Sequence, residues 1–229
     1  MANFLRMLLG FALLPACWGA GKAFFLCLGD GSAVNTGTFS ALAGVVAFSV
    51  LWFVFPHPVK AYVFGHEMTH ALWGILFGAR PSKMKVGEKG GSVELTKSNM
   101  LITLSPYFFP FYTFVALLAT FVISFFAKPV PYMPLWLFII GFTWAFHVLF
   151  TIQSLTTKQP DIALYGRIFS WTFIFLVNAA ILLVWCAATA DRPVAGCFGT
   201  AWSCVSDAYG SAYGALKWCW TRLYGMFKG

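Results

Sequence analysis

Charged residues are scarce in this sequence. Only 10% of the 229 residues are Asp, Glu, Lys or Arg, and 60% are hydrophobic. An average soluble chain carries about 25% charged residues, so the shortage excludes a soluble globular domain. The net charge of +8 does not indicate nucleic-acid binding, because the Lys and Arg residues are scattered through short loops and helix ends. There they orient membrane helices and contact lipid headgroups.

No Cys-x-x-Cys pair occurs among the six cysteines, so the sulfurs are poor candidates for zinc ligands. Cys17, Cys27 and Cys186 fall in apolar segments and are interpreted as packing residues. Cys197 and Cys204 fall in a segment that reads as a short polar loop. They could form a disulfide if that loop faced an oxidising compartment.

Long apolar runs recur along the chain and predict six transmembrane helices, at residues 5–28, 38–55, 60–78, 100–127, 135–155 and 168–188. The first run is too long for a removable signal peptide, and Lys22 can extend its ammonium to the interface. Pro106 and Pro110 predict a kink or an unwound turn near the start of the fourth run. We therefore expect an all-α polytopic protein of a bacterial cytoplasmic membrane.

Residues 80–98 carry the one β pattern. Alternating segments flank Gly90-Gly91, which predicts a β-hairpin; an ordinary basic surface loop is the alternative. The unpaired edge of such a hairpin could hold a substrate in extended form by strand addition.

The segment after residue 191 differs in character from the apolar runs. It places aromatic and leucine side chains at helical spacing beside basic residues, which predicts an interfacial amphipathic helix. Those side chains are Tyr209, Tyr213, Leu216, Trp220 and Leu223. The expected organisation is two N-terminal helices (1–59), a membrane core (60–190) and this tail (191–229).

The most informative stretch is Gly65-His66-Glu67-Met68-Thr69-His70-Ala71-Leu72. Histidines four residues apart lie on one face of a helix and can share a metal ion, and Glu67 can act as general base toward a metal-bound water. With four His and three Glu in the chain, such a motif arises by chance about once in a thousand. Two packed, hydrogen-bonded histidines are the alternative, but ionisable groups at membrane depth are usually functional.

A catalytic zinc site needs a third protein ligand besides His66 and His70. His57 lies between two prolines and is expected at the interface. His147, within an apolar run, is either a ligand or a hydrogen-bonded polar group. Asp161 follows Pro160 at the start of the last predicted helix, where a carboxylate is favoured.

The motif, the predicted hairpin after it and an aspartate about ninety residues on together resemble the site-2 protease family of intramembrane zinc metalloproteases. The resemblance covers roughly residues 60–188. It implies a Zn²⁺ ion bound by His66, His70 and Asp161, Glu67 as catalytic base, and hydrolysis of peptide bonds in or near transmembrane segments of membrane-protein substrates.

The sequence departs from the family around the aspartate. The family usually has Asn-x-x-Pro-x-x-x-Leu-Asp-Gly there, whereas this chain has Lys-Gln-Pro-Asp-Ile-Ala-Leu-Tyr-Gly, ending at Gly166. His147 therefore stays open as the third ligand. No PDZ-like insertion is present, so any selection of substrate must come from the membrane part. Basic residues in short loops favour a cytosolic hairpin side.

Two other functions remain in view. A non-proteolytic scaffold or regulator could keep the metalloprotease-like fold, although an intact Glu67 is then unexplained. A small transporter could use His147, Gln153 and Asn178 as a polar pathway, but these residues are sparse and the repeat symmetry usual in transporters is missing.

Overall fold

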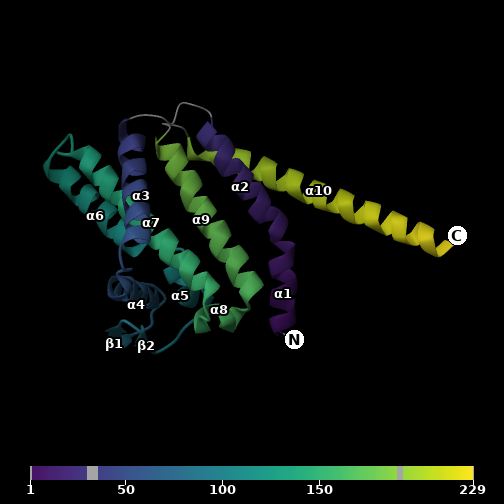
Figure 1. Ribbon diagram of the computed structural model, residues 1–229, viewed down its shortest axis with the longest axis horizontal. Coiled ribbons are helices and arrows are strands. Elements are labelled where there is room, and N and C mark those ends of the chain that lie inside the picture. Colours follow the sequence, from purple (N-terminus) through teal and green to yellow (C-terminus); the bar gives the residue numbers. More distant parts are fainter. Residues whose placement is uncertain (1, 30–35, 190–192, 229) are drawn as a thin grey trace. The chain divides into compact units, whose positions relative to one another are not determined.

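The computed structural model describes residues 2–29, 36–189 and 193–228 (Figure 1). The described chain is mostly helical, as the sequence predicts. Its elements are α1 (Ala2–Ala12), α2 (Leu14–Gly29), α3 (Thr36–Val54), α4 (Val59–Leu76), β1 (Pro81–Gly87), β2 (Gly90–Leu95), α5 (Met100–Leu104), the 3-10 helix η1 (Ser105–Tyr107), α6 (Phe111–Phe126), α7 (Met133–Thr156), α8 (Pro160–Tyr165), α9 (Arg167–Thr189) and α10 (Val194–Lys228).

Two compact units make up the chain. One consists of residues 1–33 and 166–229 and contains α1, α2, α9 and α10. The other consists of residues 34–165 and contains α3 to α8 with the hairpin. Every residue that the sequence proposes for metal binding or base catalysis belongs to the second unit.

Four helices are long and apolar enough to cross a membrane: Asn3–Leu28, Thr36–Val54, Met133–Thr156 and Arg167–Ala188. A fifth span results if Met100–Tyr107 and Phe111–Phe126, bent by 83° at the break between them, are counted as one. These helices indicate a membrane protein. The bend confirms the break that Pro106 and Pro110 predict.

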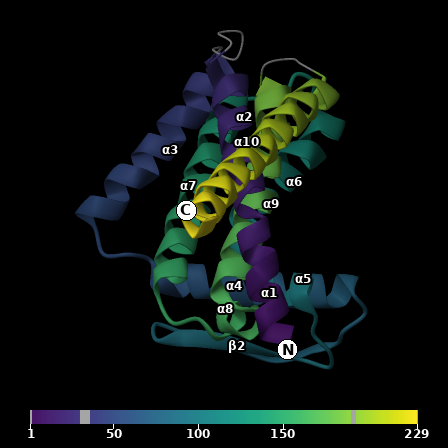
Figure 2. The ribbon, with the colours of Figure 1, turned by 90° about the vertical axis from the view of Figure 1, so that its right-hand side faces the viewer.

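The expected count of six spans is not confirmed, because α4 is not among the candidate helices in the described part of the chain. Lys60 and three ionisable groups of the His-Glu-x-x-His turn lower its hydropathy. The helix lies crosswise near one end of α3 and α7 in both views (Figures 1 and 2). The motif is therefore on a helix that crosses the ends of α3 and α7 and does not run parallel to them.

Small residues allow α3 and α7 to approach closely. A Cβ added to Gly141 would overlap the carbonyl of Ala41, and one added to Gly44 would overlap the carbonyl of Phe138. Aromatic side chains, among them Phe48 and Phe150, then fill the core beside this contact. Backbone approach through small residues is the usual way in which membrane helices associate.

Gly141→Ala is expected to lower the free energy of unfolding by about 1–3 kcal/mol, since α3 and α7 must move apart to admit a methyl group. Thermal unfolding in detergent measures the loss. Gly199→Ala on α10 is the matched control, because a Cβ there meets no atom within 4 Å. An equal effect of the two substitutions would contradict the close contact.

The unit that contains α1, α2, α9 and α10 has a core of small residues and cysteines. It includes Ala23, Cys27, Leu183, Cys186, Ala187, Cys197, Ala201 and Cys204. The expected polar loop around Cys197 and Cys204 is wrong, and the disulfide that such a loop could allow is not formed. Both residues lie on α10 and not in a loop, both thiols are free, and seven residues along a helix separate the Cα atoms by about 10.5 Å.

The tail is helical as predicted, and α10 extends well past α2 and α9 (Figure 1). The aromatic and leucine side chains named for it above are all exposed, and Trp220 is 71% exposed. The guanidinium of Arg222 lies over the ring of Trp218. Placement of this helix at a membrane interface remains a prediction.

The predicted hairpin is confirmed. β1 and β2 pair antiparallel with Gly87 opposite Gly90, so Glu88 and Lys89 form the turn, whereas the expected Gly90-Gly91 turn is wrong because both glycines belong to β2. The hairpin lies along α4 (Figure 2), and both strands contact that helix. Lys60 of α4 and Glu88 form an ion pair of 3.1 Å. The hairpin thus covers the helix that carries the His-Glu-x-x-His motif.

Candidate metal centre

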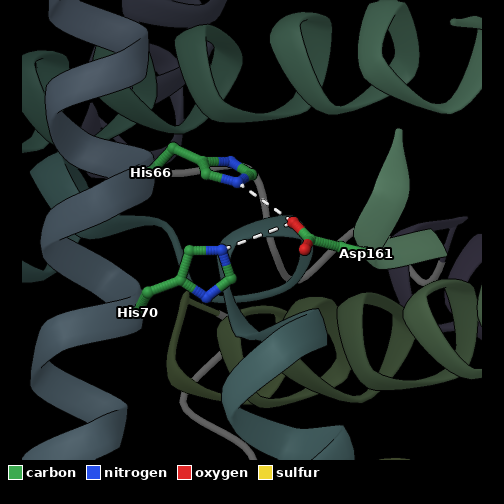
Figure 3. Close-up of side chains that lie close together, drawn as sticks. All are labelled: His66, His70 and Asp161. Atoms are coloured by element: carbon green, nitrogen blue, oxygen red, sulfur yellow. Dashed lines mark ion pairs between the residues drawn. The ribbon is translucent and has the colours of Figure 1, made fainter. Parts of the chain in front are cut away.

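Three side chains converge at one point near the end of the bundle. His66 and His70 project from successive turns of α4, and Asp161 reaches them from the first turn of α8 (Figure 3). Asp161 Oδ2 lies 3.5 Å from His66 Nε2 and 3.4 Å from His70 Nε2. In the described part of the chain this is the one group of His, Cys, Asp and Glu side chains whose ligand atoms all lie within 4.8 Å of one another.

The spacing of these atoms fits a tetrahedral metal ion. Zinc binds His nitrogen and carboxylate oxygen at about 2.0–2.2 Å, so two ligands of one tetrahedron are about 3.4 Å apart. The two N···O separations in the site have this value. Two imidazoles and one carboxylate are also a donor set that zinc accepts in catalytic sites, with a fourth position open to water.

The imidazoles are oriented by hydrogen bonds on their far sides. His70 Nδ1 donates to the carbonyl of Ile102 at 2.9 Å, so Nε2, which faces Asp161, is the nitrogen that the neutral imidazole offers to a metal ion. His66 Nδ1 lies 3.3 Å from the hydroxyl of Tyr62, and that hydroxyl lies 2.6 Å from Ser154 Oγ. Such outer partners fix the tautomer and raise ligand basicity at metal sites.

Asp161 is held by a third group besides the two histidines. The hydroxyl of Tyr107, a fully buried residue of η1, donates to Asp161 Oδ2 at 3.2 Å. Burial opposes ionisation of this carboxyl, but hydrogen bonds from His66 and His70 outweigh burial and bring its pKa below the ordinary value. Asp161 is therefore a carboxylate at neutral pH, the form that binds metal.

Glu67 is buried beside the histidines, with 7% of the residue exposed. Burial raises the pKa of its carboxyl, and a backbone hydrogen bond from Val93 of β2 opposes that rise. β2 comes this close because residue 91 is glycine: a Cβ there would lie 2.9 Å from Glu67 Cγ. The hairpin thus positions the proposed base.

A cavity of about 680 Å³ opens over the site. His66, Glu67, His70 and Asp161 belong to its lining. The rest of the lining comes from Tyr62, Val63, Lys89, Gly90, Gly91, Ser92, Val93, Leu95, Ser98, Thr103, Lys158, Gln159 and Pro160. β2 therefore forms one wall of the cavity, and the connection between α7 and α8 contributes Lys158 and Gln159 to the lining.

The structure brings Asp161, and not His147, to the two histidines of the motif. His147 is buried on α7 and lines a separate small cavity. His57 stacks on Trp52 with ring centroids 3.7 Å apart and does not belong to the group of converging ligand atoms. Gln153 is exposed on α7, whereas His147 on the same helix is buried.

Sequence reasoning missed the residues that support the three ligands. Tyr62 carries a readable signal, because it precedes His66 by four residues and so lies on the same helix face. Tyr107, Val93 and the carbonyl of Ile102 carry none, because their roles depend on how the bent segment and the hairpin return to α4.

Comparison with known proteins adds no family assignment. No protein-family model, curated protein or solved structure matches this chain.

Proposed function

We propose that this protein is a membrane-embedded zinc endopeptidase that cleaves membrane-protein segments in or near the bilayer. The observation that carries the proposal is the convergence of His66, His70 and Asp161 in one cavity that Glu67 also lines. The resemblance of the sequence to site-2 proteases points to the same chemistry.

Each residue has a distinct role in the proposed reaction. A zinc ion held by His66, His70 and Asp161 would act as a Lewis acid and lower the pKa of a water molecule at its open position. Glu67 accepts the proton of the attacking water and passes it to the leaving amine. Tyr62 and Tyr107 keep His66 and Asp161 in place.

The hairpin gives the substrate a place to bind. A peptide bond within a helix is hydrogen-bonded and shielded, so the segment must be extended before it is cut. β2 pairs with β1 alone in the described part of the chain, and its residues 90–93 line the cavity. An extended peptide can therefore add along β2 next to Glu67.

Metal content and cleavage, measured together on the wild-type protein, test the proposal. The protein purified in detergent is expected to hold about one zinc per chain, the occupancy of a single catalytic site. It should cleave at least one of a panel of model transmembrane peptides. A chelator should stop cleavage and added zinc should restore it. A well-folded protein that binds no zinc would overturn the proposal.

A non-proteolytic scaffold is the second candidate, favoured by the unusual sequence around Asp161. It predicts a bound metal with no cleavage of any peptide. Retention of a buried glutamate between the histidines argues against it, because a structural site has no use for a general base.

A further inference from the structure

Two lysines line the cavity above the proposed metal centre. Lys89 lies in the turn of the hairpin, and Lys158 lies in the connection between α7 and α8. Both side chains are exposed. Neither lysine takes part in an ion pair with any residue that the structure describes.

No acidic residue of the cavity lining forms an ion pair with either lysine. Glu67 and Asp161 are the acidic residues in the cavity lining, and both have other partners: the backbone of Val93 for Glu67, and the two histidines and Tyr107 for Asp161. The two lysines offset the two carboxylates, so the divalent cation of the proposed function leaves the cavity with a net charge of about +2. A cleft with one sign of charge concentrates ligands of the opposite sign.

The lysines occur where an extended peptide would pass. Lys89 directly precedes β2, the strand that forms one wall of the cavity, and a Cβ added to Gly90 would meet no atom within 4 Å. Lys158 comes from a different element, three residues before Asp161. Charged groups are thus available from two elements around a segment bound next to Glu67.

We infer that the site selects peptide segments with acidic side chains flanking the bond to be cut, and that Lys89 and Lys158 recognise them. This inference rests on the proposed function. Acidic residues are costly inside a bilayer, so such segments lie at the membrane boundary. The position of the motif on α4, which is not a candidate span, suits a substrate of this kind.

Binding to an inactive variant tests the inference without relying on catalysis. Zinc-loaded full-length Glu67→Gln protein in detergent is titrated with two fluorescent peptides, one with Glu on both sides of an apolar centre and one with Gln at those positions. Each exposed ion pair contributes about 1.5- to fivefold to affinity, so the Glu peptide should bind about two- to 25-fold tighter. The difference should shrink as salt is added.

Substitutions of the two lysines test whether they cause the tighter binding of the Glu peptide. Lys89→Ala and Lys158→Ala should each lower the affinity for the Glu peptide by about 1.5- to fivefold. Lys89→Glu combined with Lys158→Glu should make the Gln peptide the tighter ligand. Affinity for the Gln peptide should not change, which shows that the cavity is intact. Lys85→Glu is the matched control, because Lys85 is exposed on β1 and does not line the cavity.

Equal affinity for the two peptides, or a preference that Lys85→Glu removes as well, would overturn the inference. So would tighter binding of a short-chain anionic phospholipid than of the Glu peptide, which would assign the lysines to lipid headgroups. A lysine-dependent preference for the Glu peptide in a protein whose wild type cleaves neither these peptides nor any of the transmembrane panel would uphold charge selection and contradict the proteolytic function.

Discussion

Glu67→Gln is expected to lower the rate of peptide cleavage by about 10²–10⁴-fold, the usual contribution of a general base. Glutamine has nearly the same size and can still occupy the position beside Val93, but it cannot accept a proton from water. Bound zinc should stay near one per chain, because Glu67 is not among the three converging ligands. Cleavage of a model transmembrane peptide and metal content, both measured on the same preparation, check the two halves of this prediction.

Glu94→Gln provides the control for Glu67→Gln. Glu94 is an exposed residue of β2 that does not line the cavity, so the same substitution there should leave cleavage unchanged. If the Glu67→Gln protein keeps zinc and still cleaves at the wild-type rate, Glu67 is not the base. The water would then need another proton acceptor among the groups that line the cavity.

The local features of the fold could be predicted because each depends on a short sequence pattern. The hairpin follows from alternating residues around Gly90 and Gly91, and the break near Pro106 and Pro110 follows from the missing proline N–H groups. Apolar runs predict the remaining long helices. These signals are local, so tertiary contacts do not change them.

The direction of α4 was not predictable in the same way. Its apolar residues alone suggest a membrane span, but Lys60 and the motif reduce its hydropathy, and the hairpin covers one side of it. A helix of this composition is stable crosswise at the end of the bundle when a hairpin shields it. Which outcome applies depends on contacts between segments far apart in the sequence.

The candidate site shows the same division. The i, i+4 spacing of His66 and His70 dictates that they share a helix face, so their pairing follows from sequence alone. The choice between Asp161 and His147 as the third ligand does not follow from the sequence, because both are far from the motif along the chain and each lies in or next to an apolar segment. The connection from α7 to α8 determines the third ligand, because it places Asp161 beside the two histidines.

Removal of a proposed ligand should have the largest effect of all. In His70→Ala and in Asp161→Ala the ion loses one of three protein ligands, and zinc affinity should fall by more than about 100-fold, since loss of an outer hydrogen bond alone costs 10- to 100-fold. Cleavage should become undetectable.

His147→Ala is the comparison that separates the two candidate third ligands: it should keep its zinc, because His147 lies outside the group of converging atoms. Zinc affinity and thermal unfolding are measured together, so that a lost ligand is distinguished from a lost fold. Zinc retained in Asp161→Ala and lost in His147→Ala would move the third ligand to α7.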